Sequence, residues 1–301
     1  FHFYTIYKMY INVRKSIMFL IFMKKLLFII LLSVLSSFSY NNFISQKIKI
    51  ISYNIRYNNP NDGKDIWENR RSTIVNFVLE QNPDFLGLQE VTQDQLLYLS
   101  SKFSNYNYLG VGRDDGKSKG EYSPIYYNKF NYNLILSNTF WLSETPKNIS
   151  VGWDASMERI CTYGLFTHNE SGIKVWVFNT HFDHIGEIAR EKSVDLILSK
   201  IKELTQNKDR VIITGDFNLM DDSKPIKKLQ KSFIDVNINM IRNNKLFGTF
   251  NDFVINSISE KRIDYIFQKN LILINSTHGH IKTNNGRWAS DHHPVISVLK
   301  L

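Results

Sequence analysis

The polar residues of this chain that could do chemistry stand where apolar runs of the sequence end. Eight of them combine carboxylates, carboxamides and imidazoles without a thiolate: Asn54, Glu90, His181, Asp216, Asn218, Asp264, Asp291 and His292. Oxygen-rich ligand sets without cysteine suit Mg²⁺ or Mn²⁺ rather than a structural zinc ion. Histidines beside such a cation can donate to a phosphate oxygen or take a proton from water. The set therefore predicts metal-assisted attack of water on a phosphoester.

Each of these residues also has a purely structural explanation. Asn and Asp are ordinary turn residues, and the sequence GDFN at residues 215–218 would suit a turn that follows a strand. Their shared position argues for function, because active groups of sheet proteins gather where strand ends meet.

The segments that must position these residues are predicted to be many strands and a few helices. Helical spacing of apolar residues favours helices at 67–81, 92–103 and 187–206. Apolar runs predict strands at 47–57, 83–91, 123–128, 132–143, 160–168, 174–182, 210–218, 261–267, 271–281 and 294–300. Strands and helices in mixed order indicate layers of helix packed on sheet.

Six short motifs resemble the endonuclease/exonuclease/phosphatase superfamily. They are SYNIR, LGLQEV, FNTHFDH, ITGDFN, RIDYIF and SDHHPV, and they follow the family order between residues 50 and 296. Each motif alone is weak, but all of them in order are specific. The resemblance implies an α/β fold, a four-layer α/β sandwich in which two packed mixed β-sheets are flanked by helices.

The resemblance also implies which residues lie at the metal. Glu90 matches the principal metal ligand, Asn54 matches its partner near the metal, and Asp291 matches a second acid on the metal side. His293 follows in the same motif and is expected to face away from the site, because side chains alternate along extended backbone.

The remaining residues of the set match positions near the scissile phosphate. By resemblance, His181 contacts the phosphate, and Asp216 with Asn218 orients the attacking water. Asp264 would hold His292 through an acid–histidine hydrogen bond that fixes its tautomer. Either Asp216 or His292 could take the proton of the water, and the sequence leaves both open.

Other stretches resemble a secreted bacterial branch of the superfamily and supply candidates for the rim of the site. Arg159 and Asp183 are predicted to bind substrate, and Trp288 beside the SDHH motif could stack a base. Further rim candidates, each equally compatible with a solvated loop or a structural ion pair, are Arg113, Glu121, His184 and Arg190.

Residues 1–39 are predicted to be a leader. Met23 is the expected true start, and residues 23–39 combine two lysines, an apolar run and small residues in the manner of a signal peptide. A run of about ten apolar residues is short for a membrane span, although a membrane-anchoring leader is the alternative. We therefore expect a secreted or periplasmic/cell-envelope protein with no stable membrane span after cleavage.

Residues 40–301 are then expected to form one catalytic domain. The leader holds five Lys and Arg residues and no acid, so the net charge of +9 falls to +4 for the rest of the chain. This mild positive charge permits an anionic substrate without requiring nucleic acid. The lone cysteine, Cys161, excludes an internal disulfide.

Together these features predict an Mg²⁺-dependent or Mn²⁺-dependent phosphoesterase. We favour a phosphodiesterase or nuclease of the exonuclease-like kind, whose partner is a phosphoester substrate such as nucleic acid; no protein partner is implied. A phosphatase or sphingomyelinase-type hydrolase on a lipid or sugar phosphate is the alternative. A second alternative is a non-catalytic binding protein with the same fold. Against it, every expected catalytic position is filled.

Overall fold

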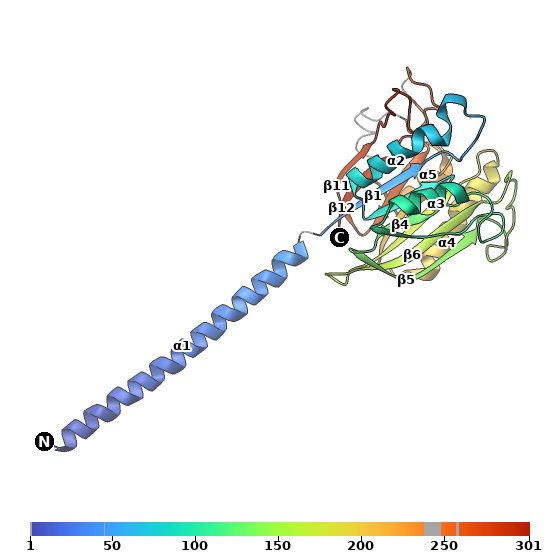
Figure 1. Ribbon diagram of the computed structural model, residues 1–301. Coiled ribbons are helices and arrows are strands. Elements are labelled where there is room, and N and C mark those ends of the chain that lie inside the picture. The colour runs from blue at the N-terminus through green and yellow to red at the C-terminus, as the bar shows by residue number, and fades with distance from the viewer. Residues whose placement is uncertain (1, 45, 238–247, 257–258) are drawn as a thin grey trace. The chain divides into compact units, whose positions relative to one another are not determined.

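The computed structural model describes residues 2–44, 46–237, 248–256 and 259–301 (Figure 1). The chain divides into two units, Phe1–Gln46 and Lys47–Leu301. The first unit consists of the long helix α1 (His2–Ile44), and the second contains every other described helix and strand.

Helix α1 is apolar and exposed. Between Phe3 and Ser33 its length and its mean hydropathy of 2.2 would allow it to cross a membrane. Signal sequences near an N-terminus have the same properties, so the helix supports either form of leader. The expected cleavage point after residue 39 falls within α1, in a part of the helix whose side chains the structure does not describe.

The first sheet of the second unit is mixed. Its strand order is β11 (Ile272–His278), β12 (Val295–Lys300), β1 (Lys47–Asn54), β2 (Phe85–Gln89), β4 (Ile125–Asn128) and β3 (Tyr106–Leu109). Strand β1 runs parallel to β2 and antiparallel to β12. The parallel register sets Asn54 opposite Gln89, so Asn54 and Glu90 emerge together at one edge of the sheet.

The second sheet repeats this arrangement. Its order is β5 (Tyr132–Trp141), β6 (Ile160–His168), β7 (Lys174–His181), β8 (Arg210–Asp216), β10 (Asp264–Lys269) and β9 (Ile234–Asp235). Parallel pairing of β7 with β8 sets His181 opposite Asp216. Antiparallel pairing of β8 with β10 sets Asp264 opposite Asp216, so three polar residues share one edge.

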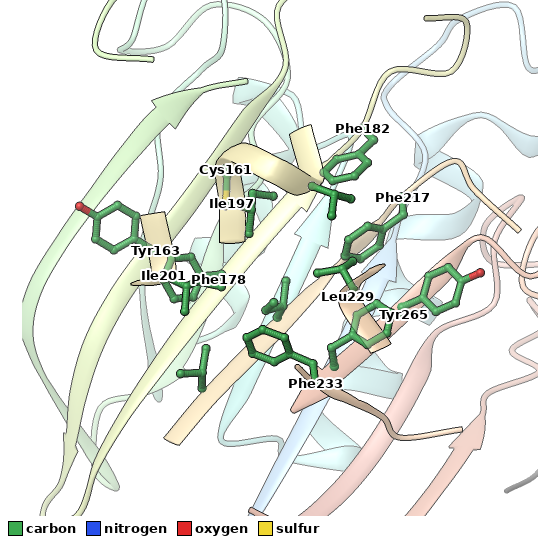
Figure 2. Close-up of a cluster of buried hydrophobic side chains, with 14 of the residues drawn as sticks. Cys161, Tyr163, Phe178, Phe182, Ile197, Ile201, Phe217, Leu229, Phe233 and Tyr265 are labelled. Carbon is green, nitrogen blue, oxygen red and sulfur yellow. The ribbon is translucent and has the colours of Figure 1, made fainter. Parts of the chain in front are cut away.

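Helices cover the outer face of each sheet. Helices α2 (Trp67–Gln81) and α3 (Gln93–Lys102) share a buried apolar cluster with β1, β2 and β4, and the short 3₁₀ helix η1 (Gly63–Asp65) precedes α2. Helices α4 (Glu187–Leu204) and α5 (Lys224–Gln230) share a second cluster with β6, β7, β8 and β10. Figure 2 shows this second cluster, in which Ile197 and Ile201 of α4 and Leu229 of α5 gather with Phe178 and Tyr265 of the sheet.

A third apolar cluster fills the space between the sheets. Phe85 of β2 contacts Tyr132 and Phe166 of the other sheet, with ring centroids 4.6 and 4.7 Å apart. The layers are therefore helix, sheet, sheet and helix, and the four-layer sandwich expected from the sequence is confirmed.

A buried polar tie joins the two sheets beneath the polar strand ends. Asn179 of β7 donates to the Leu88 carbonyl at 2.7 Å and accepts hydrogen bonds from Gln89 at 2.7 Å and from Thr214 at 2.9 Å. Gly87 makes this approach possible, because a Cβ there would collide with Thr214 Oγ1 and lie 2.7 Å from Asn179 Oδ1.

We predict that Gly87→Ala lowers the free energy of unfolding by about 1–3 kcal/mol, because the added methyl group forces the sheets apart at the tie. Urea denaturation measures the change. Thr214→Ala in the same background removes the collision with the hydroxyl and should recover part of the loss as a non-additive effect. An unchanged urea midpoint for Gly87→Ala would show that the contact relaxes freely.

Candidate active site

A cavity of about 840 Å³ opens at the polar strand ends, within the usual range for ligand pockets of roughly 300–1,000 Å³. Six residues of the predicted set line it: Glu90, His181, Asp216, Asn218, Asp291 and His292. The other two, Asn54 and Asp264, are fully buried and form hydrogen bonds to lining residues. The structure therefore brings all eight residues together.

Asn54 holds two of the carboxylates that face the cavity. Its side-chain amide donates to Glu90 Oε1 at 2.9 Å and to Asp216 Oδ2 at 3.0 Å, and its oxygen accepts from the Arg56 amide. The Tyr57 amide donates to the other Glu90 oxygen at 3.0 Å. Glu90 has a backbone φ of 61°, a left-handed conformation that residues other than glycine rarely adopt. Asn54 thus fixes carboxylates through its amide group.

The carboxylates are crowded in a way that suits a cation. Ligand atoms of Glu90, Asp216 and His292 all lie within 4.8 Å of one another. Burial and the charge of Asp264 raise the pKa of Asp216 to about 7. Burial also raises the pKa of Asp291 to about 6, with Glu90 adding to the rise and His292 opposing it. Carboxylates that resist ionisation in this way would be stabilised by a divalent cation, so the residues fit a metal.

His292 lies among carboxylates that favour its protonated form. Its Nδ1 lies 2.8 Å from Asp264 Oδ2, and its Nε2 lies 3.7 Å from Asp216 Oδ2. Burial alone would lower the pKa of His292, but the nearby carboxylates of Asp264 and Asp216 raise it well above the ordinary value. The Nε2 proton therefore points toward the carboxylates of the cavity, ready to donate to an anionic oxygen.

The pKa of His181 is shifted in the opposite direction. Its Nε2 lies 3.3 Å from Asn218 Nδ2 and 3.5 Å from Asp216 Oδ2. Burial, followed by the charges of Arg159 and Arg113, lowers the pKa of His181 well below the ordinary value. Two imidazoles whose pKa values are shifted in opposite directions thus flank the same carboxylate, and such divergent environments are typical of acid–base pairs in active sites.

The rim candidates form two fixed ion pairs near His181. Arg113 makes a bidentate contact with Glu121 at 2.9 and 3.0 Å, and Arg159 Nε contacts Asp183 at 3.3 Å. Arg159 Nη2 lies 2.9 Å from His184 Nδ1. Four of these residues line the cavity; Asp183 does not and lies beneath Arg159.

Two further rim candidates, and the neighbouring His293, lie outside the cavity. The Trp288 indole donates to the Val254 carbonyl at 2.9 Å and packs on His293, with ring centroids 4.7 Å apart. His293 is buried there, as its alternating position predicts, and burial together with His280 lowers its pKa to about 3. Arg190 donates to the Asp183 carbonyl at 3.1 Å. The structure thus places Trp288 where its ring packs on the protein itself.

The cavity also contains residues that the sequence did not single out. They are Arg56, Tyr57, Met157, Met220, Phe250, Asp252, Lys261 and Ile263. Arg56 stands inside the SYNIR motif and could have been found from it. Phe250 could not, because it reaches the site through an isolated bridge to His292 from a segment without a regular strand.

Comparison with known proteins finds several that are similar to this chain. A crystallised endonuclease/exonuclease/phosphatase from Bacteroides vulgatus is 33% identical, with a TM-score of 0.78 over 85% of this chain and 100% of that one. A mannosyl-6-phosphatase from Bacteroides thetaiotaomicron is 36% identical, with a TM-score of 0.75 over 84% of this chain and 100% of that one. Protein L388 of Acanthamoeba polyphaga mimivirus is 33% identical over 165 residues, which span 52% of this chain and 60% of that protein.

The match to a family is equally extensive. Residues 51–292, which include all eight residues of the polar set, match the Endonuclease/Exonuclease/phosphatase family, whose members hydrolyse phosphoester bonds and generally use a divalent metal. The chain belongs to the Endonuclease/Exonuclease/phosphatase family.

Proposed function

We propose that this chain is a divalent-metal-dependent phosphomonoesterase, the alternative that the sequence left open beside a phosphodiesterase. The observation that carries the proposal is the 36% identity to a mannosyl-6-phosphatase over the whole of that chain. A phosphodiesterase or nuclease, favoured from sequence alone, is the rival.

The metal is proposed to be Mg²⁺ or Mn²⁺, held by Glu90 and Asp291 with Asn54 beside them. When bound, the cation supplies positive charge to the phosphate and makes a water more acidic. Hard oxygen donors favour these two ions over softer metals.

The chain's own residues would then position the phosphate and the water. Cationic His292 donates from Nε2 to a phosphate oxygen, and Asp264 fixes its orientation. Asn218 donates an amide hydrogen bond to the phosphate beside His181. Asp216, which lies between the two imidazoles, orients the attacking water and accepts its proton.

We further propose that residues 1–39 are a leader, with a signal peptide from Met23, and that 40–301 form a secreted or cell-envelope catalytic domain. The apolar helix α1 and the separate compact unit Lys47–Leu301 support this division. Expression of the full chain in a bacterial host, followed by N-terminal sequencing of the exported product, would test it.

Hydrolysis of p-nitrophenyl phosphate should be lost in EDTA and restored by Mg²⁺ or Mn²⁺, because the proposed site needs a cation. Bis(p-nitrophenyl) phosphate and a single-stranded oligonucleotide should be poorer substrates by kcat/KM. Initial rates for the three substrates, measured on one purified preparation, distinguish the monoesterase from the nuclease. Cleavage of the diesters without cleavage of the monoester would favour the nuclease rival.

Metal should stabilise the protein more at higher pH. Because the pKa values of Asp216 (about 7) and Asp291 (about 6) are raised, the contribution of these two groups to the stability of the metal-free fold is fully present below their ordinary value of 3.8 and is lost as the pH rises through the raised values. Cations bind the ionised form. The increase in melting temperature caused by Mn²⁺ should therefore be larger at about pH 8 than at about pH 5. Glu90→Gln should reduce the increase, and an equal increase at both pH values would contradict the assignment.

His292→Asn should lower kcat by roughly 10²–10⁴-fold, because it removes the charged donor while keeping an amide near Asp264. Asp264→Asn should have a smaller effect, since the imidazole remains. His293→Ala is the matched control from the same motif, and its kcat should stay near the wild-type value. Rates and melting curves on the same preparations distinguish a specific rate loss from unfolding. If His293→Ala lost its activity and His292→Asn kept a kcat near the wild-type value, the two assignments would be reversed.

A further inference from the structure

One side of the cavity has no part in the proposed chemistry. It consists of five lining residues that lie near His181, which we call the arginine wall: Arg113, Glu121, Met157, Arg159 and His184. The backbone of the wall comes from the segments around residues 113–121 and 157–159 and from the turn after β7.

The two guanidinium groups of the arginine wall are held in fixed positions. Arg113 is bound by both oxygens of Glu121 and contacts the Met157 sulfur at 3.0 Å. Arg159 is buried and lies between Asp183 and His184, at 3.3 and 2.9 Å. Fixed planar donors of this kind recognise a ligand with little loss of side-chain entropy.

Asp183 is a positioning residue for Arg159. One of its oxygens accepts from the amides of Ile185 and Gly186, at 2.9 and 2.7 Å. The other accepts from the Ser156 amide and hydroxyl, at 3.0 and 2.6 Å, as well as from Arg159. This saturated carboxylate has no free acceptor for a substrate, so it acts by fixing the wall.

The arginine wall is polar but close to neutral in charge. Each guanidinium has its own carboxylate, Glu121 for Arg113 and Asp183 for Arg159. A second phosphate would find no unpaired arginine there and would face the Glu121 carboxylate. An alkyl chain would displace water from these charged groups without replacing its hydrogen bonds.

A hydroxyl-rich ligand satisfies both requirements. Neighbouring hydroxyl groups can donate to Glu121 and accept from Arg113 or Arg159, and His184 is exposed at the cavity with its Nδ1 facing Arg159. We infer that the arginine wall binds the leaving group of the substrate, and that this group is a neutral polyhydroxylated molecule. The inference rests on the proposed phosphomonoesterase activity and names its substrate class.

The test compares kcat/KM for four monoesters in the presence of metal: a hexose 6-phosphate, hexyl phosphate, a hexose 1,6-bisphosphate and p-nitrophenyl phosphate. The wild-type protein should prefer the hexose 6-phosphate over hexyl phosphate by at least about tenfold, because each hydrogen bond to the wall adds to transition-state binding. A preference for the alkyl or bisphosphate ester, with p-nitrophenyl phosphate still hydrolysed, overturns this inference and leaves the proposed function standing. Activity on diesters alone would overturn both.

Two variants locate the recognition. His184→Ala should lower the kcat/KM ratio of hexose 6-phosphate to p-nitrophenyl phosphate by about tenfold through KM. Ile188→Ala, an exposed neighbour outside the cavity, is the matched control and should leave the ratio unchanged. Glu121→Gln removes the bidentate counter-charge of Arg113 and leaves it only the longer contact with Asp114 at 3.7 Å, so it should raise the ratio of bisphosphate to monophosphate by about fivefold. Ratios that do not move in either wall variant would place leaving-group recognition elsewhere.

Discussion

The active site depends on how closely two β-sheets approach each other at one edge. Asn179 of β7 donates to the carbonyls of Leu88 and Pro124 in the opposing layer, at 2.7 and 2.9 Å, and it receives hydrogen bonds from Gln89 and Thr214. All these groups are buried, so breaking the tie would leave polar atoms unsatisfied in the core. The apolar cluster between the sheets is non-directional, whereas the hydrogen bonds of this tie fix both direction and distance.

Because the tie fixes the sheets, two pairs of parallel strands deliver their polar ends to the same place. Strands β1 and β2 bring Asn54 and Glu90, and β7 and β8 bring His181 and Asp216. Burial, with the charge of Asp264 added to it, disfavours the ionised form of Asp216 and raises its pKa. Glu90 also has an unusual positive φ. Such features reduce stability, and they persist because the surrounding packing holds the backbone in place.

The same edge separates chemistry from recognition. The polar set stands at or next to strand ends, while the arginine wall comes from loops between strands and from the turn after β7. Loops can change length and sequence without disturbing the tie between the sheets. A fold built this way supports different leaving groups with one hydrolytic centre, which is why family membership alone does not name a substrate.

By itself the sequence indicated layers of helix packed on sheet and the polar set at strand ends, because local apolar periodicity and short motifs encode them. The four layers followed from the resemblance to the family. Short elements such as β3, β9 and α5 escaped prediction, since four, two and seven residues carry little periodicity. Only the tertiary structure decided that Trp288 packs on His293, that Asp183 lies beneath Arg159, and that Phe250 reaches the cavity. These outcomes depend on contacts between residues distant in sequence, and no local pattern specifies which of two possible partners a side chain will meet.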